Sequence, residues 1–272
     1  MTCVDTEKRS ILHHAFMEIN YASYDVIKSI LFRSCIPTSL FIPDVHGNTP
    51  LHYACQTMHP MITFLLEMYG KDAFTAINLP NNDGHTPLHL ALKYGNDVAT
   101  DLLSDFPSLR LDLTDNEKRT PAHYAAMQTD INIFGTFFQI DNIVDKVELN
   151  AQDGYGMTPL HYACLNENHS PCLFLSTQIP DDDIGILVTM FKDCHGSTPL
   201  HYACSFGMTL NVVSLLINAP QAFAVWLNLT DGFGKMPLQY VRDDSHIFHM
   251  IEDWKQGKLD YDKCINALAL SH

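Results

Sequence analysis

A seven-residue motif recurs along this chain at a nearly constant interval, and this repetition limits the folds that the chain can adopt. The motif reads TPLHYAC or a close variant in five copies, which begin at Thr49, Thr86, Thr120, Thr158 and Thr198. Weaker copies, SILHHAF and MPLQYVR, begin at Ser10 and Met236, and neighbouring copies start 34 to 40 residues apart. Repetition at an interval of about 20 to 50 residues indicates small structural units that stack side by side.

A turn signal of the form Asp-x-x-Gly-x-Thr precedes most copies of the motif. It reads DVHGNT, DGYGMT, DCHGST and, less closely, DGFGKM, in copies that begin at Asp44, Asp153, Asp193 and Asp231. Two copies depart from it: NNDGHT has Asn81 in place of the aspartate, and DNEKRT has Lys118 in place of the glycine. Asp and Asn side chains bond nearby backbone, and Gly adopts positive φ at little cost. Each copy therefore predicts a tight turn.

The motif itself predicts the start of a short helix. Thr49 is suited to the N-cap, and Pro50 suits the first helical position, where its missing N–H costs nothing. Small apolar residues such as Ala54 then share one helical face. A second apolar run with helical spacing follows, such as MITFLLEMY at 61–69 or LNVVSLLI at 210–217. Neither helix can bury its apolar face alone, so neighbouring units must stack.

This pattern resembles the ankyrin repeat, whose signature is T-P-L-H-x-A followed by a second helix. The resemblance extends over about residues 10–243. It implies an all-α repeat solenoid, in which stacked helix–turn–helix units are joined by β-hairpin-like turns. It also implies that the motif histidines tie each helix start to the neighbouring turn by hydrogen bonds; these are His13, His52, His89, His123, His161 and His201.

We expect a single domain over residues 1–272 with about seven units. The full repeats are residues 44–80, 81–114, 115–152, 153–192 and 193–230. Residues 1–43 and 231–272 are expected to be capping units, the second with a closing helix over about 247–270. The intervals exceed the usual ankyrin period of about 33 residues. The surplus, in segments such as 71–81 and 177–192, predicts lengthened second helices or packed loops.

The charge balance restricts the kinds of partner. The chain has 31 acidic and 16 basic residues and a formal net charge of −15. Nucleic acids and anionic membrane surfaces both require clustered Lys and Arg, so neither is expected. An acidic surface instead favours encounter with a protein that has a basic surface.

Other features of the sequence indicate where the protein acts. The start, MTCVDTEKRS, lacks the apolar segment of a secretory signal, and no apolar run is long enough to insert into a membrane. Eight cysteines without such a signal do not indicate a disulfide framework. We expect a monomer in a reducing cytoplasmic or other intracellular compartment, which would be the host cytosol for a secreted bacterial effector.

Three motif copies place a histidine and a cysteine three residues apart, in the pairs His52/Cys55, His161/Cys164 and His201/Cys204. Such pairs could share a helix face and suggest a metal or catalytic site. Ala126 fills the cysteine slot in another copy, so we interpret these cysteines as small buried hydrophobic residues. Cys194 lies in a turn where a thiol could be exposed, and we interpret it as turn variation. We expect no catalysis, no cofactor and no metal.

A tyrosine slot is shared by Tyr53, Tyr124, Tyr162 and Tyr202. Aromatic ladders that stack on nucleic acid come with basic grooves, which this acidic chain does not offer. We therefore expect these rings to pack between adjacent inner helices, with their hydroxyls near the concave surface.

Slots that vary between repeats are candidates for recognition, because the fold does not fix their side chains. They lie in the turns and just after the first helix, where the ankyrin resemblance implies a concave face and turn tips. The candidate partner-binding residues are His46, Asn48, His85, Lys93, Tyr94, Glu117, Arg119, Met127, Gln128, Tyr155, Met157, Leu165, Asn166, His195, Ser205, Phe206 and Phe233. Aromatic residues, Met and Arg are enriched in interface cores, which favours the large members of this set.

Several functions are compatible with these features. The leading interpretation is a non-catalytic adaptor, scaffold or effector that binds a protein, and ankyrin proteins also occur as inhibitors and substrate receptors. The chain could instead be the recognition domain of a larger multidomain protein or enzyme. A third hypothesis is a metal- or thiol-dependent catalyst that uses the histidine and cysteine slots.

Overall fold

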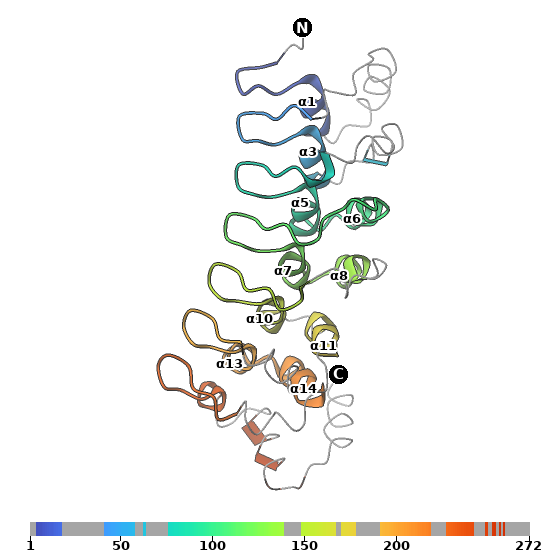
Figure 1. The fold of residues 1–272 in the computed structure, drawn as a ribbon. Coiled ribbons are helices and arrows are strands. Elements are labelled where there is room, and N and C mark those ends of the chain that lie inside the picture. Colours follow the sequence, from blue (N-terminus) through green and yellow to red (C-terminus); the bar gives the residue numbers. More distant parts are fainter. Residues whose placement is uncertain are drawn as a thin grey trace. The chain divides into compact units, whose positions relative to one another are not determined.

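The computed structural model describes residues 4–17, 41–57, 62–63, 76–138, 148–166, 170–177, 191–218, 227–241, 248–249, 252–253, 256 and 258. It divides into two compact units, the first over residues 1–147 and the second over residues 148–272. The regular elements of the described ranges are helices, joined in each unit by projecting hairpin-like turns (Figure 1). The predicted all-α repeat solenoid is thereby confirmed.

In the first unit, short inner helices form a row in which each contacts the next. These helices are α1 (Ile11–Met17), α3 (Pro50–Gln56), α5 (Pro87–Lys93) and α7 (Pro121–Ala126). A second layer contains α6 (Asp97–Ser104) and α8 (Ile131–Phe138), which contact each other and pack on α5 and α7 respectively. Figure 1 shows the hairpins on one side of the inner row and α6 and α8 on the other.

The second unit repeats this two-layer arrangement. Its inner row contains α10 (Pro159–Leu165), α13 (Pro199–Ser205) and the 3₁₀ helix η3 (Pro237–Tyr240). Its second layer contains α11 (Ser170–Thr177) and α14 (Thr209–Asn218), which contact each other and the inner helices of their own repeats. Helix α14 confirms the helix that was predicted from the apolar run at 210–217.

Some predicted segments lie outside the described residues. This is so for most of the run at 61–69, for residues 178–190 and for nearly all of the closing helix predicted at 247–270. Within the segment 71–81, residues 76 and 77 are described and both are buried, as expected for a packed segment. The division of the chain into about seven repeats stays a prediction.

The inner helices begin as the motif predicts. Thr49 has an extended backbone, with φ −86° and ψ 164°, and Pro50 takes the first helical position. The same Thr-Pro start is found at Thr86, Thr120, Thr158 and Thr198. The small apolar residues that follow, such as Ala54 and Cys55, are fully buried. This close packing of small side chains lets neighbouring inner helices stack.

A carboxylate or amide organises each hairpin, and it is buried in the hairpins that begin at Asp44, Asp115, Asp153, Asp193 and Asp231. The Oδ1 atom of Asp193 accepts hydrogen bonds from the backbone N–H groups of His195 and Ser197, at 2.9 and 2.8 Å. Asn81 does the same with its own turn, so the change from Asp to Asn preserves the hairpin. In the described part of the chain, hairpins of this kind are residues 5–9, 44–48, 81–85, 115–119, 153–157, 193–197 and 231–235, each closed by a backbone bond from its first to its fifth residue.

The hairpin at residues 5–9 was missed by the sequence analysis, which placed the first motif at Ser10 without a preceding turn. Its sequence, DTEKRS, closely matches DNEKRT at 115–120. In both copies a lysine takes the glycine slot at positive φ, with 60° for Lys8 and 63° for Lys118. Comparing the two segments directly would have identified the hairpin from sequence.

A tyrosine joins most hairpins to the inner helix that follows. The hydroxyl of Tyr202 donates to Oδ2 of Asp193 at 2.6 Å, and burial together with this bond raises the pKa of Tyr202. Equivalent bonds link Tyr53, Tyr124, Tyr162 and Tyr240 to the first aspartate of their own hairpins. The predicted packing between inner helices is confirmed where tyrosine rings meet a histidine of the preceding repeat edge-on, as in His161–Tyr202.

The one hairpin that begins with asparagine also lacks the tyrosine. Asn81 replaces the aspartate, and buried Leu90 fills the tyrosine slot of α5. A neutral amide carries no charge that needs a hydroxyl donor, and leucine needs no acceptor. The two slots therefore change together for a physical reason.

Backbone hydrogen bonds link consecutive hairpins within each unit. In the second unit, the N–H of Cys194 donates to the carbonyl oxygen of Tyr155, and the N–H of Gly232 donates to that of His195, both at 2.7 Å. Bonds of the same register link the hairpins of the first unit, from Val45 to Glu7, from Asn82 to His46 and from Asn116 to Asp83. The hairpins therefore form a ladder in each unit, and backbone hydrogen bonds recur at every step of it.

We expect alanine at Gly196 to destabilise the fold more than alanine at Gly234, which occupies the same slot one repeat later. Both glycines have positive φ, 75° and 74°, which costs an L residue about 1–2 kcal/mol. A Cβ at Gly196 would also lie 2.7 Å from the backbone nitrogen of Gly232, whereas among the described residues nothing lies within 4 Å of one at Gly234. Urea unfolding should show a further loss of about 1–3 kcal/mol for Gly196→Ala. Equal losses of unfolding free energy in the two variants would mean that neighbouring hairpins can move apart without cost, and would contradict this prediction.

We expect the Asp193 and Tyr202 slots to be energetically coupled. Tyr202→Leu alone leaves the second oxygen of a buried carboxylate without its hydroxyl donor, and this costs about 1–3 kcal/mol. The double variant Asp193→Asn/Tyr202→Leu reproduces the pair Asn81/Leu90 and removes the charge. A double-mutant cycle measured by urea unfolding should therefore give a coupling of about 1–2 kcal/mol, and strict additivity would contradict this account.

Candidate partner-binding surface

His52 and its counterparts connect successive repeats, and both of their ring nitrogens are engaged in hydrogen bonds. The backbone N–H of Thr49 donates to Nδ1 of His52 at 3.1 Å, so this nitrogen is an acceptor. Its Nε2 therefore carries the hydrogen and donates to the carbonyl oxygen of His85, in the next hairpin, at 3.0 Å. The same pair of bonds is made by His13, His89, His161 and His201. The structural role implied by the ankyrin resemblance is confirmed for these five histidines, and Nδ1 of His123 likewise accepts from the N–H of Thr120 at 3.0 Å.

The cysteines that follow these histidines are small core residues, as the sequence predicts. Cys55, Cys164 and Cys204 are buried, and burial raises the pKa of the Cys204 thiol to about 12. A reactive thiol needs a lowered pKa, so this environment opposes thiolate chemistry. Among the described residues, no group of three or more His, Cys, Asp or Glu side chains could hold a metal ion. Cys194 is exposed in its hairpin.

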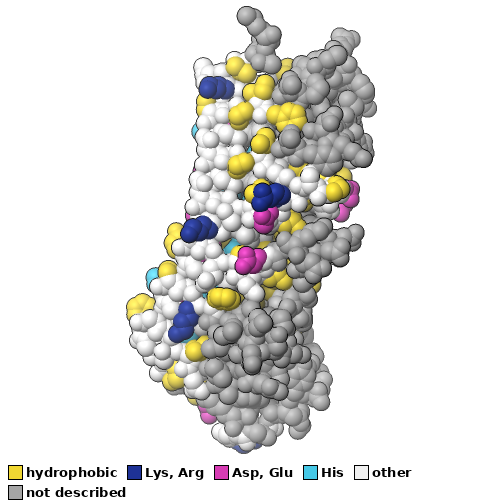
Figure 2. Space-filling model, in the orientation of Figure 1, with side chains coloured by type: hydrophobic (Ala, Val, Ile, Leu, Met, Phe, Trp, Pro, Cys, Tyr) yellow, Lys and Arg dark blue, Asp and Glu magenta, His cyan; other side chains and the backbone are white. Residues whose placement is uncertain are grey.

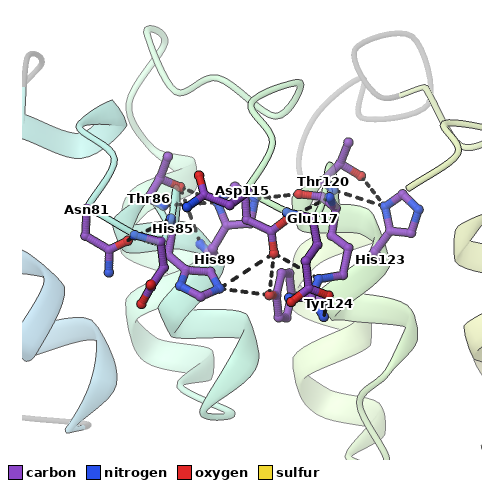
Figure 3. Close-up of polar contacts among 12 residues, drawn as sticks. Asn81, His85, Thr86, His89, Asp115, Glu117, Thr120, His123 and Tyr124 are labelled. Atoms are coloured by element: carbon purple, nitrogen blue, oxygen red, sulfur yellow. Dashed lines mark hydrogen bonds and ion pairs between the residues drawn. The ribbon is translucent and has the colours of Figure 1, made fainter. Parts of the chain in front are cut away.

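His85 was predicted to contact a partner, and the structure places it in the interior instead. Its side chain is only 8% exposed, and Nε2 lies 2.9 Å from the hydroxyl of Tyr124 and 3.7 Å from Oδ2 of Asp115 (Figure 3). The Tyr124 hydroxyl donates to Asp115, so the imidazole donates in turn to that hydroxyl oxygen. His85 therefore links two consecutive hairpins of the first unit, and burial lowers its pKa.

Two further candidates near this cluster are already engaged with each other. Arg119 donates through Nε to Oδ2 of Asp115 at 2.9 Å and pairs with Glu117 at 3.1 Å. Its guanidinium also lies 5.1 Å from the ring centre of Tyr124. Arg9, Asp5 and Glu7 make the same ionic arrangement in the first hairpin. These charges brace the hairpins, although Glu117 itself is exposed.

The other predicted residues differ in accessibility. The exposed ones are His46, Lys93, Tyr94, Tyr155, His195, Ser205, Phe206 and Phe233. The half-buried ones, besides Arg119, are Asn48, Met127, Gln128, Met157, Leu165 and Asn166. Side chains in the second group partly serve the fold: Asn48, for example, accepts a hydrogen bond from Asn81 of the next hairpin at 2.8 Å.

Among the described residues, the exposed tyrosine and phenylalanine side chains lie at two kinds of position. Tyr155 and Phe233 lie at hairpin tips and are 54% and 76% exposed, and Figure 2 shows hydrophobic side chains along the hairpin edge of the second unit. Tyr94 and Phe206 follow inner helices and are 44% and 58% exposed. The hairpin aspartates and motif histidines hold the repeats together, and none of these four positions is one of those slots. The repeat architecture therefore does not require an aromatic ring there.

A family model described as Ankyrin repeats (3 copies) matches the chain over residues 12–110, 74–143, 101–186 and 142–225. The chain belongs to the ankyrin-repeat family. Ankyrin repeats are generally protein–protein interaction modules, and proteins built from them are typically non-catalytic. A search of curated proteins found no match. Among the described residues, no helix of this ankyrin chain is long and apolar enough to cross a membrane.

Two exposed basic residues at the hairpins of this ankyrin chain, Lys192 and Lys235, are not among the predicted partner-binding residues, although Lys235 occupies a variable turn position. Lys192 and Lys235 are exposed at the hairpins of the second unit, where Lys192 donates to the carbonyl oxygen of Thr230 at 2.7 Å. Their signal was the distribution of charge along the sequence, since residues 191–241 contain no other basic residue. Counting charge over the whole chain concealed this local feature.

We expect the folded ankyrin array to lose stability as the pH falls from about 6.5 toward 4. Burial lowers the pKa of His52 and of His89 to about 4, so the folded chain keeps these rings neutral while the unfolded chain protonates them near pH 6.5. Each should cost about 2 kcal/mol at pH 5. Urea unfolding at about pH 7 and about pH 5 measures the loss.

His52→Gln should flatten this pH dependence, because the variant has one proton fewer to take up on unfolding. Carboxylates of unfolded chains titrate near pH 4, so the histidines dominate the upper part of the window. A urea midpoint that is the same at both pH values would contradict the assignment of neutral, buried rings.

Proposed function

We propose that this ankyrin chain is a non-catalytic adaptor, scaffold or effector that binds one partner protein. Its binding surface comprises the hairpin tips and the residues that follow the inner helices. The observation that carries the proposal is the exposure of Tyr94, Tyr155, Phe206 and Phe233 at slots that vary between otherwise similar repeats. Aromatic side chains are frequent hot spots in protein interfaces, and burying each one contributes about 1.5–3 kcal/mol.

The remaining predicted residues extend this surface. His46, Glu117 and His195 lie at hairpin tips, Lys93 and Ser205 lie at the ends of inner helices, and all five are exposed. Polar residues around apolar anchors form the rim of a typical interface and exclude water from the anchors. His85 is not part of the proposed surface, because its side chain is buried between hairpins.

Charge and thiol chemistry support further parts of the proposal. The net charge of −15 supports a partner with a basic surface, which would associate faster at low ionic strength. Cys55, Cys164, Cys172, Cys194 and Cys204 are free thiols in the structure, which supports a reducing intracellular compartment. We propose that the chain is monomeric before it meets its partner.

Affinity capture from a cell lysate tests the proposed surface. The variant Tyr94→Ser/Tyr155→Ser/Phe206→Ser/Phe233→Ser removes the exposed aromatic rings from the variable slots. We expect it to lose at least about tenfold of the captured partner, because each ring is a candidate hot spot. The captured protein is quantified by mass spectrometry against the wild-type chain.

A matched control removes exposed apolar side chains from the second helix layer instead. Val98, Ile131 and Leu173 are 51%, 54% and 38% exposed, and we expect Val98→Ser/Ile131→Ser/Leu173→Ser to retain the partner. Both variants must first match the wild-type circular dichroism and thermal melt. Loss of the partner by the control alone would move the surface to the outer helices, and capture of no protein by the wild type would contradict the interaction module.

A further inference from the structure

The hairpin tips of the second unit present a row of aromatic side chains with fixed spacing. This aromatic tip row consists of Tyr155, His195 and Phe233, each two residues after the hairpin aspartate. The carbonyl oxygens of Tyr155 and His195 accept the backbone bonds that connect one hairpin to the next, both at 2.7 Å. All three side chains are exposed. The row is therefore a preorganised surface on which a segment of extended chain can lie.

The same slot in the first unit has different chemistry. It holds Glu7, His46, Asp83 and Glu117. Glu7 pairs with Arg9 at 2.9 Å and Glu117 pairs with Arg119 at 3.1 Å, so these tips are polar and partly neutralised within their own hairpins. The backbone ladder is shared by both units and a histidine occupies this slot in each, as His46 and His195, whereas Tyr155 and Phe233 belong to the second unit.

Segment 191–241, which carries two of the three tips, has two basic and two acidic residues and so no formal net charge, unlike the acidic chain as a whole. The charged residues of segment 191–241 are Lys192, Asp193, Asp231 and Lys235. Asp193 and Asp231 are buried, and both oxygens of each carboxylate accept hydrogen bonds from backbone N–H groups or a tyrosine. The exposed charges of this segment are therefore two ammonium groups.

The two lysines are held close to the hairpins. Lys192 donates to the carbonyl oxygen of Thr230 at 2.7 Å, in the segment that leads to the last hairpin. The ammonium of Lys235 lies 5.0 Å from the ring centre of Tyr240. An ammonium has three donors, so each lysine keeps donors for an external carboxylate.

We propose that the aromatic tip row binds an extended acidic segment of the partner protein. Apolar side chains of that segment pack against Tyr155 and Phe233, and its carboxylates pair with Lys192 and Lys235. The inference rests on the proposed function and names the chemistry of the partner at this site. A basic segment would meet two like charges here, and a nucleic-acid strand would need a longer basic track than two lysines provide.

Selection from a phage-displayed library of random peptides on the full chain tests this proposal. We expect the enriched peptides to combine Asp or Glu with aromatic or aliphatic residues. Fluorescence anisotropy then measures one enriched peptide, a copy with lysine in place of its acidic residues, and a single-stranded oligonucleotide. The acidic peptide should bind at least about tenfold more tightly than the other two probes.

Variants locate the binding site. Tyr155→Ser/Phe233→Ser should weaken the enriched peptide about tenfold or more, and Lys192→Glu/Lys235→Glu should weaken it and remove the preference for acidic residues. Glu7→Ser/Asp83→Ser changes the same slot in the first unit and should leave binding unchanged. Each variant is compared with the wild type by circular dichroism and thermal melting.

Three results would overturn the proposal: enrichment of basic peptides or of none, tighter binding of the oligonucleotide, or peptide binding that survives Tyr155→Ser/Phe233→Ser. Lysate capture separates this failure from failure of the proposed function. A partner captured through the variable slots while the library selects no acidic peptide would retain the interaction module and reject the acidic segment. Failure of both experiments would reject both.

Discussion

The hydrogen bonds that cross from one repeat to the next hold each unit of this protein together, because the helices are too short to be stable alone. Two kinds of bond do this work. The backbone of each hairpin bonds to the next hairpin, as from Gly232 to His195, and a buried imidazole bridges the helix of one repeat to the following hairpin, as from His201 to the carbonyl oxygen of Lys235. Both use backbone acceptors, so they constrain the repeat frame and leave the tip side chains free to vary.

This separation of frame and tip explains how an ankyrin array can carry a specific surface. The two carboxylate oxygens of Asp193 accept hydrogen bonds from its own hairpin and from Tyr202. Both ring nitrogens of His201 form hydrogen bonds within the repeat frame. Carboxylates and imidazoles that could act chemically are therefore buried and hydrogen-bonded within the fold. The side chains exposed for binding, such as Phe233, are those that form none of these frame hydrogen bonds. A binding surface can change without altering the stack.

Much of the fold followed from local patterns. The Thr-Pro helix start, the buried small residues at Ala54 and Cys55, and the turns at Asp-x-x-Gly are short-range effects, so sequence spacing predicts them. Accessibility was harder to predict. His85 occupies a variable slot but is buried, because Asp115 of the next hairpin and Tyr124 of α7 lie against it. These residues are 30 and 39 positions further along the sequence. Such a neighbour is set by stacking and not by local sequence.

The sequence by itself determined the repeat, the positions of helix starts and turns, and the residues that vary between copies, because these depend on contacts within a few residues. Tertiary structure decided which variable residues reach solvent and which charged groups lie at the surface. Lys192 and Lys235 are the exposed charges of their segment because Asp193 and Asp231 turn inward to bond backbone N–H groups. The physical reason is that burial and pairing depend on the neighbouring repeat, which stacking brings into contact.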